Sequence, residues 1–491
     1  MASLRFKSTE NQDSVRECGG IAALVALLAP SSSSALHELA AEALCVVCAG
    51  NTQNQDCVRE CGGVAALVGL LAPGGPAAAQ WEAAAALWTL CYRNSQNRDC
   101  VRECGGLAAL VGLLAHGHSA AVHEAAAGAL RNLCVNNTEN DDSIRECGGV
   151  AALVGLLAPG HSAAMREQAA AALRNLCANS TENKDSIREC GGVAALVGLL
   201  APGASAAAHE HAAGALSNLC SSTQNVVCVR WCGGIAALVG LLAPGNPAAV
   251  HEHTAATLRR VCYENAMNAD CVRDCGGIAA LVALLAPGGS AAVHEQAAGA
   301  LLNLAFESEQ CREAVRACGG VAALVMLLAP GNAVAVHHNV AGALVSLTRG
   351  SVPCREAVMA CGGIAALVAL LAPGNAAAVH QNVAGALVHL TSESEQCREA
   401  VRACGGVAAL VVLLAPGSPT AVHVHAAGAL MILTSESEQC REAVRECGGL
   451  AALERMLACA SSAAAHKWVA AALRNLGHVH HVVVGELDQP N

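Results

Sequence analysis

Cysteine and histidine are the residues of this 491-residue chain whose types and spacing could bind a metal ion. Four pairs of Cys stand four residues apart, which places two thiols on one side of a helix and would supply half of a zinc site. No second pair of ligands follows at zinc-finger spacing, and equivalent segments have Ser or Ala at the first position. We therefore predict that the Cys are small buried apolar residues in a reducing compartment, and we expect no metal. The pairs are Cys57 with Cys61, Cys100 with Cys104, Cys228 with Cys232, and Cys271 with Cys275.

Histidine also recurs at nine equivalent points of the sequence, which we call the His ladder. Because His titrates near neutral pH, such a row could respond to pH. Successive members stand about one repeat apart, which is too far for them to share a metal ion. The pattern favours a structural His that hydrogen-bonds to a neighbouring loop. The ladder consists of His37, His123, His209, His251, His294, His337, His380, His423 and His466.

The sequence lacks the common catalytic motifs. It contains no Gly-x-x-x-x-Gly-Lys phosphate loop, no Gly-x-Ser-x-Gly elbow and no His-Glu-x-x-His metal motif. Its closest run, His209-Glu210-His211, places the two His on different sides of a helix. We predict a protein that is not an enzyme, has no catalytic residues and needs no cofactor.

Composition and charge exclude several classes of partner. Hydrophobic residues make up 54% of the chain and aromatic residues only 2%, which is typical of closely packed helices rich in Ala and Leu. The net charge of −11 disfavours nucleic acid and anionic membrane surfaces. Apolar runs such as residues 21–29 are far shorter than the roughly 20 residues that a membrane span needs. Without a visible secretory signal, the sequence predicts a cytoplasmic location, with the nucleus as the alternative.

A Gly-Gly pair that follows Cys marks an internal repeat. Nine of the ten intervals between successive pairs are 43 residues and one is 42. The sequence therefore predicts eleven repeats over residues 11–482, with a short extension at 1–10 and a tail at 483–491. The first Gly of each pair is Gly19, Gly62, Gly105, Gly148, Gly191, Gly233, Gly276, Gly319, Gly362, Gly405 and Gly448.

Each repeat is predicted to contain three helices. The first is short, as at residues 13–18, and the Gly-Gly pair ends it with a sharp turn. The second begins at once, as at residues 21–28, and carries apolar residues at helical spacing. The third is longer, as at residues 121–134. A single repeat cannot bury its own apolar faces, so stacking on its neighbours must bury them.

The pattern of Gly148-Gly149-Val150, Leu153, Leu156 and Leu157, followed by residues 169–176, resembles the armadillo repeat. The resemblance extends over nearly the whole chain. It implies an all-α, right-handed solenoid of three-helix repeats. It also implies that the third helices line a concave groove, in which extended segments of partner proteins bind.

Polar residues on the third helix are the candidate groove residues. Positions are counted here from the first Gly of each pair, and positions 20, 23 and 27 share one helix face. By the resemblance, an Asn at position 27 binds the partner's main chain, to which its amide offers both a donor and an acceptor. The predicted groove residues are Asn132, Asn175, Asn218, Asn303 and Asn475 at position 27, and Gln168, His211, His253, Gln296, Asn339, Asn382 and His425 at position 20.

Position 23 carries no Trp in any repeat, whereas nuclear import adaptors of the importin-α type have Trp there. Gly128 and Gly214 are examples of the small residues found instead, so we expect a small, flat and open groove floor. A second row, an Arg three residues before most Gly-Gly pairs, stands three residues after an acidic residue. This spacing favours helix-stabilising ion pairs.

These observations predict a non-catalytic scaffold or adaptor that binds extended protein segments. The net charge favours a neutral or basic segment. Two alternatives remain, namely a nuclear transport receptor of the importin-α-like type and a structural subunit of a cytoskeletal or ciliary assembly. Because the end repeats lack evident polar caps, the solenoid ends are also candidates for self-association.

Overall fold

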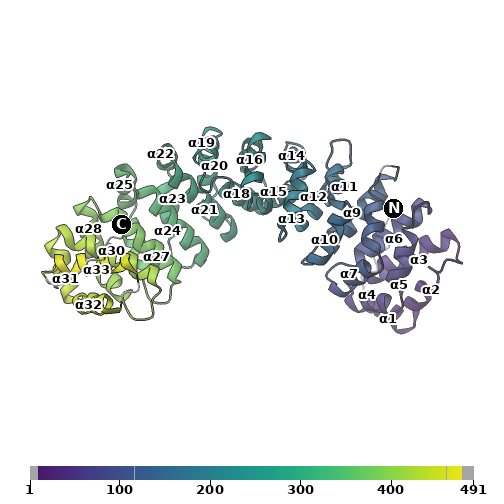
Figure 1. Cartoon of the computed structure of the whole chain (residues 1–491), viewed down its shortest axis with the longest axis horizontal. Coiled ribbons are helices and arrows are strands. Elements are labelled where there is room, and N and C mark those ends of the chain that lie inside the picture. Colours follow the sequence, from purple (N-terminus) through teal and green to yellow (C-terminus); the bar gives the residue numbers. More distant parts are fainter. Residues whose placement is uncertain (1–8, 116, 460–461, 478–491) are drawn as a thin grey trace, which may run out of the picture. The chain divides into compact units, whose positions relative to one another are not determined.

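The computed structural model describes residues 9–115, 117–459 and 462–477. Within these ranges the chain forms 33 helices and no strand (Figure 1). The predicted all-α fold of stacked three-helix repeats is confirmed by this order. The number of repeats, the superhelix handedness and the boundary at residue 482 stay predictions. The predicted tail at 483–491, and all but the last two residues of the extension at 1–10, lie outside the described residues.

Each repeat contributes a short first helix, a short second helix and a longer third helix. The first helices are α1 (Thr9–Glu17), α4 (Thr52–Glu60), α7 (Ser95–Glu103), α10 (Thr138–Glu146), α13 (Thr181–Glu189), α16 (Thr223–Trp231), α19 (Ala266–Asp274), α22 (Glu309–Ala317), α25 (Val352–Ala360), α28 (Glu395–Ala403) and α31 (Glu438–Glu446). The second helices are α2 (Gly20–Ala26), α5 (Gly63–Leu70), α8 (Gly106–Gly112), α11 (Gly149–Gly155), α14 (Gly192–Gly198), α17 (Gly234–Leu241), α20 (Gly277–Ala283), α23 (Gly320–Met326), α26 (Gly363–Ala369), α29 (Gly406–Val412) and α32 (Gly449–Cys459). The third helices are α3 (Ser34–Cys48), α6 (Ala77–Leu90), α9 (Ala120–Leu133), α12 (Ala163–Leu176), α15 (Ala206–Leu219), α18 (Ala248–Val261), α21 (Ala291–Glu307), α24 (Val334–Thr348), α27 (Ala377–Thr391), α30 (Thr420–Glu436) and α33 (Ala463–Asn475).

The chain divides into two compact units, an amino-terminal unit (Met1–Leu241) and a carboxy-terminal unit (Leu242–Asn491). In the amino-terminal unit the third helices α3, α6, α9, α12 and α15 pack one against the next. In the carboxy-terminal unit α18, α21, α24, α27, α30 and α33 do the same. Among the described residues no single helix is long and apolar enough to cross a membrane, although the bent pairs α16 with α17 and α25 with α26 meet that test jointly.

The local structure of one repeat follows from its cap residues and its apolar spacing. Asn137 caps α10 by accepting a hydrogen bond from the backbone N–H of Asn140 at 3.1 Å. Gly148 adopts a left-handed φ of 78° between α10 and α11, which glycine tolerates without steric cost. Ser162 caps α12 in the same way as Asn137 caps α10. The core of the repeat is then formed by fully buried side chains, of which Ile144 and Leu173 are examples.

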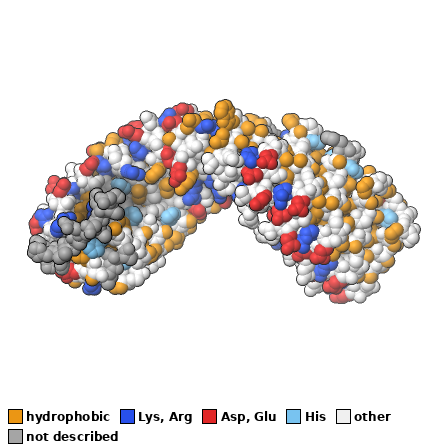
Figure 2. All heavy atoms as spheres, in the orientation of Figure 1, with side chains coloured by type: hydrophobic (Ala, Val, Ile, Leu, Met, Phe, Trp, Pro, Cys, Tyr) orange, Lys and Arg blue, Asp and Glu red, His pale blue; other side chains and the backbone are white. Residues whose placement is uncertain are grey.

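Polar side chains join consecutive first helices. Asn97, fully buried, donates to the carbonyl oxygens of Leu90 and Gln55 at 3.0 and 3.2 Å. Its own side-chain oxygen accepts from Arg59, which also pairs with Asp56 at 2.6 Å. Figure 2 shows the resulting mixture of acidic and basic side chains over α7, α10 and α13. In the first four repeats the Arg of this row donates to an Asn of the next repeat, so these bonds stabilise the stack. Arg316 and Arg402, in later repeats, pair with a Glu of their own helix.

The His ladder fastens the third helix to the loop before it. In eight of its nine members, from His37 to His423, Nε2 lies 2.9–3.2 Å from the carbonyl oxygen eight residues earlier. A carbonyl can only accept, so Nε2 carries the hydrogen in each pair. Two repeats lack the His, and in one of them Gln80 makes the same bond, at 2.9 Å to Ala72. These contacts support the structural interpretation of the ladder.

The prediction that the cysteines are buried is correct for one group and wrong for another. Cys91, Cys134 and Cys177, at the end of the third helix, are buried. The cysteines directly before the Gly-Gly pairs are largely exposed, as at Cys61 and Cys232. They lie where the chain turns between the first two helices, so little of the stack covers them. The cysteines whose side chains the structure describes are free thiols.

Candidate functional site

The Asn residues at position 27 form a row along the third helices. In each of them Nδ2 donates to the backbone carbonyl of the residue 44 positions earlier, on the preceding third helix. This intramolecular contact is absent from the sequence prediction, which assigned the Asn to a partner. The bonds run from Asn132 to Trp88 (2.8 Å), Asn175 to Arg131 (3.0 Å), Asn218 to Arg174 (3.1 Å), Asn303 to Arg259 (2.7 Å) and Asn475 to Met431 (3.2 Å).

Position 20 contributes a second polar row whose members differ in their contacts. Asn339 and Asn382 donate to carbonyls 44 residues earlier, at 3.1 and 2.9 Å. The remaining contacts are local or involve an Arg of the preceding repeat, while His253 is half-buried on α18. Arg131 donates to Gln168 (3.1 Å), Arg174 lies 3.5 Å from His211, Arg259 donates to Gln296 (3.4 Å), and His425 lies 2.8 Å from the carbonyl oxygen of Ala421.

Position 26 was missed by the sequence reasoning, yet its side chains cover the small residues at position 23. A Cβ added at Gly128 would lie 2.6 Å from the ring of Trp88, and one added at Gly214 would lie 2.8 Å from Nε of Arg174. Leu302 covers Gly342 in the same way, at 2.5 Å. The prediction of a flat, open floor is therefore wrong at Gly128, Gly214, Gly299 and Gly342, because each of them receives a larger side chain from the preceding repeat.

The amino-terminal unit has a polar pocket of about 430 Å³ beside this row, which we call the Arg pocket. One carboxylate, Glu210, lies in it and pairs with Arg174 at 3.3 Å. Burial lowers the pKa of Arg98 from its ordinary value, but an Arg starting so high remains charged. The lining residues are Tyr92, Arg93, Arg98, Arg131, Asn132, Val135, Ala171, Arg174, Asn175, Glu210 and His211.

A second pocket of the same unit is mainly apolar and lies next to the Arg pocket. Trp88 and Ala85 line it together with Cys45 and Thr89. Tyr92 and Asn132 line both pockets. The side chain of Tyr92 is 48% exposed, which makes an aromatic surface available to a bound segment.

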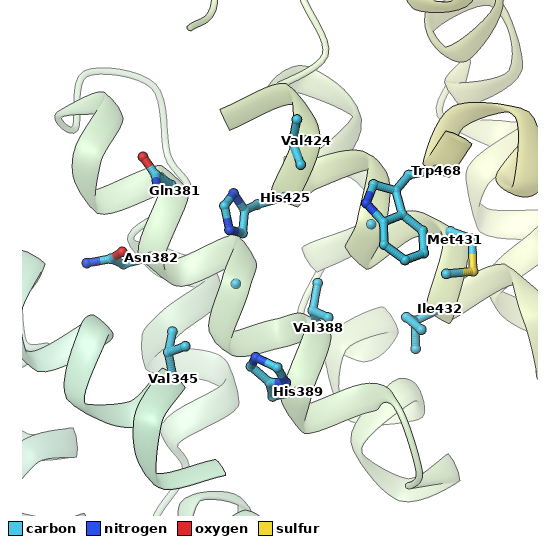
Figure 3. A pocket seen from close by; sticks show the side chains of 12 residues that line it. Val345, Gln381, Asn382, Val388, His389, Val424, His425, Met431, Ile432 and Trp468 are labelled. Carbon is cyan, nitrogen blue, oxygen red and sulfur yellow. The ribbon is translucent and has the colours of Figure 1, made fainter. Parts of the chain in front are cut away.

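The carboxy-terminal unit has a pocket of about 270 Å³ between α24, α27, α30 and α33. Figure 3 shows Trp468, Met431, Ile432 and Val388 around one end of it. His389 also lines this pocket. Burial lowers the pKa of the His389 ring, and the charges of Arg349 and Arg355 lower it further. A neutral imidazole results, which can donate and accept hydrogen bonds.

These surfaces offer amide, guanidinium, imidazole and apolar contacts, all of which suit binding. In the part of the chain that the structure describes, no group of three or more His, Cys, Asp or Glu side chains is arranged to hold a metal ion. The predicted site residues thus lie along the third helices, and the structure brings many of them against Arg side chains that the prediction omitted.

Comparisons with known proteins agree with this geometry. The family model described as Armadillo/beta-catenin-like repeat matches residues 94–135, 137–178, 180–221 and 265–306. An engineered protein of known crystal structure is 30% identical, with a TM-score of 0.77, and the match covers 84% of this chain and 98% of that one. A second engineered protein is 28% identical over 50% of this chain and 96% of its own, with a TM-score of 0.47. No curated protein matches the sequence. With repeats of this family in both units, and an engineered protein of known structure that is 30% identical and aligned over most of its length, the chain belongs to the armadillo/beta-catenin-like repeat family.

Proposed function

We propose that this protein is a non-catalytic scaffold that binds extended segments of partner proteins along its third helices. Armadillo repeats generally form protein-interaction scaffolds, and solenoids of this family are typically non-catalytic. The proposal includes a cytoplasmic location. The observation that carries it is the row of Asn side chains at position 27, which recurs on successive third helices beside open pockets.

The hydrogen bonding of these amides supports a role in binding. A side-chain amide has two N–H donors and an acceptor oxygen, and the bond to the preceding repeat uses one donor. The amide orientation is thereby fixed, so a bound peptide group does not have to order it. Neighbouring helices pack about 8–10 Å apart, and an extended chain advances about 3.3 Å per residue. One Asn can therefore meet about every third residue of a bound segment.

Replacing Asn132, Asn175 and Asn218 together by Ala should weaken binding about tenfold or more, because each peptide hydrogen bond contributes about 1 kcal/mol. The measurement is the dissociation constant of peptides selected by the native protein from a random display library, followed by fluorescence anisotropy. Circular dichroism of the variant establishes that its helices persist, since the same Asn side chains also join adjacent repeats.

The matched control replaces Glu17, Glu60 and Glu189 by Ala. These side chains lie on first helices and are 72–73% exposed. Their replacement should leave peptide affinity unchanged. The proposal fails if the folded Asn variant binds the selected peptides as tightly as the native protein, or if the library yields no binding peptide.

A further inference from the structure

We infer that the Arg pocket of the amino-terminal unit binds an anionic side chain, a carboxylate or a phosphorylated hydroxyl, of the extended segment. The inference rests on the proposed function and names the chemistry that the segment must carry. It also departs from the expectation drawn from net charge, which favoured a neutral or basic segment throughout.

The charges that line the pocket support this inference. Arg93, Arg98, Arg131 and Arg174 all line it, and Glu210 is the one carboxylate among the lining residues. The pocket is therefore strongly positive, although the chain as a whole carries a net charge of −11. An anion that enters it meets an attraction of short range, since salt screens distant charges beyond about 8–10 Å.

Two of the four Arg side chains are already committed to the fold. Arg98 donates from Nε to the carbonyl of Cys91 at 3.1 Å and from a terminal nitrogen to that of Val135 at 2.6 Å. Arg174 pairs with Glu210 at 3.3 Å, and its side chain is 29% exposed. These contacts place fixed positive charge in the pocket without neutralising all of it.

Arg93 and Arg131 keep open bonding capacity, and the Arg93 guanidinium lies over the Tyr92 ring at 5.3 Å. Arg131 is the one of these two that stands on a third helix. One of its terminal nitrogens donates to the neutral side chain of Gln168 at 3.1 Å. Among the described residues no carboxylate lies within ion-pair distance of it. A guanidinium presents five N–H donors in a planar fork, which fits the two oxygens of a carboxylate or phosphate. Arg131 and Arg174 occupy position 26 of successive repeats, with the small Ala171 also lining the pocket.

The neighbouring apolar pocket indicates a second feature of the bound segment, an apolar side chain. Trp88 occupies position 26 of the preceding repeat, and Tyr92 lines both pockets. Because one repeat corresponds to about three residues of an extended chain, an apolar side chain beside Trp88 should stand about three residues from the anionic one. In the carboxy-terminal unit the same position holds Arg259 and Arg474 in the first and last repeats, with Leu302, Val345, Val388 and Met431 between them. The inference is made for the amino-terminal unit because its pocket is lined by four Arg side chains.

The test uses three sets of labelled peptides in a Gly-Ser background. Each peptide has one Leu, and Ala, Glu or phosphoserine is placed at successive separations from it on either side. Fluorescence anisotropy with the full chain should show that Glu or phosphoserine, at a separation of about three residues, binds about tenfold more tightly than Ala. The preference should decrease as salt is raised. Tighter binding of phosphoserine identifies phosphate as the natural group, and equal or tighter binding of Glu identifies carboxylate.

The combined variant Arg131→Glu and Arg174→Glu should abolish the preference. Arg131→Gln with Arg174→Gln provides a milder version if the first fails to fold. The matched control, Arg316→Glu with Arg402→Glu, makes the same charge change on first helices and should keep the preference.

The inference is overturned if the Ala peptides bind as tightly as the charged ones, or if the Arg131 and Arg174 variants keep the preference. Ala peptides that bind in an Asn-dependent manner would leave the proposed groove function intact while rejecting the anion pocket. Absence of binding by all three sets at about 1 mM, equivalent to about 4 kcal/mol of affinity, would reject the anion pocket, whereas the proposed groove function fails only on the peptides selected from the library.

Discussion

Replacing Gly149 by Ala should destabilise its repeat by about 3 kcal/mol, at the upper end of the cost of overpacking a core. Gly149 begins α11, and an added Cβ would lie 2.6 Å from a methyl group of Ile144 and 2.8 Å from its backbone oxygen. It would also lie 2.9 Å from Val111 on the preceding repeat. Because a backbone oxygen cannot turn aside as a side chain can, the helices themselves would have to separate.

Two neighbouring glycines provide matched controls for this prediction. Gly148 has open space around it but a φ of +78°, so Ala there should cost only the left-handed backbone conformation, about 1–2 kcal/mol. Gly155 lies at the end of α11 with nothing within 4 Å, so Ala there should be neutral or stabilise by up to about 1 kcal/mol.

Hydrogen exchange of the α10 and α11 amides, in the full chain, measures the local opening free energy of each variant. Local exchange is the appropriate measurement because a repeat array need not unfold in one step. Equal costs for Gly148→Ala and Gly149→Ala would contradict the crowding argument, since only the second glycine has close neighbours.

The two glycines illustrate how much of the fold the sequence could provide. Their recurrence, and the apolar spacing on either side, correctly predict a helix break and the three-helix repeat. The pair was interpreted only as a sharp turn, however, whereas the structure gives its two members different roles. The first supplies the positive φ and the second supplies the space for close packing. The second role depends on Val111, a residue of another repeat, which spacing within one repeat cannot reveal.

The candidate site shows the same limit. The resemblance to the armadillo repeat, together with the chemistry of the amide, predicted that Asn132 and Asn175 bind a main chain. Their bonds to Trp88 and Arg131 depend on the register of neighbouring helices, which the sequence of one repeat does not contain. Gly128 indicated open space in the groove because only the residues of its own repeat were considered, and not Trp88 of the preceding repeat. Comparing position 23 of each repeat with position 26 of the preceding repeat would have indicated that Trp88 covers Gly128, since Gly128 and Gly214 at the first position face the large Trp88 and Arg174 at the second.

Asp141 differs in chemical type from the residues at the equivalent position of most other repeats, and this difference predicts an effect of pH on stability. Seven residues before the Gly-Gly pair, most repeats have a donor whose side chain meets the carbonyls that end the third helix. Gln55 donates to Thr89 at 3.1 Å, and Arg98 to Cys91 at 3.1 Å. Asp141 occupies this place in the fourth repeat, is 4% exposed, and has one carboxyl oxygen without a hydrogen-bond partner. Asp141 lies in the first turn of α10, whose dipole favours a carboxylate, but the carbonyls that end the preceding third helix disfavour its charge.

Burial raises the pKa of Asp141 from 3.8 to about 7, against an opposing hydrogen bond from the Cys134 thiol and with a further increase from the charge of Asp142. The native state therefore binds a proton that the unfolded chain releases near pH 4. The stabilisation from this proton is complete below the unfolded pKa and is lost as the pH rises through about 7. The gap between the two pKa values corresponds to about 4 kcal/mol, and relaxation around the charged carboxyl should reduce the observed loss to about 2 kcal/mol.

Replacing Asp141 by Asn should therefore stabilise the region around α9 and α10 by about 2 kcal/mol at pH 8 and by much less at pH 5. Hydrogen exchange of these two helices at both pH values, corrected for the intrinsic exchange rate, measures the difference. Asp185→Asn is the control, because that carboxyl has the place of Asp142 in the next repeat, is 42% exposed and pairs with Arg188 at 3.2 Å. Its replacement should cost a few tenths of a kcal/mol. Asp141→Gln should stabilise α9 and α10 at pH 8 at least as much as Asp141→Asn does, since Gln55 shows that a longer amide side chain reaches the backbone carbonyls. If Asp141→Asn has the same effect at both pH values, the buried proton is not the cause, because only a group that titrates between them can separate the two measurements.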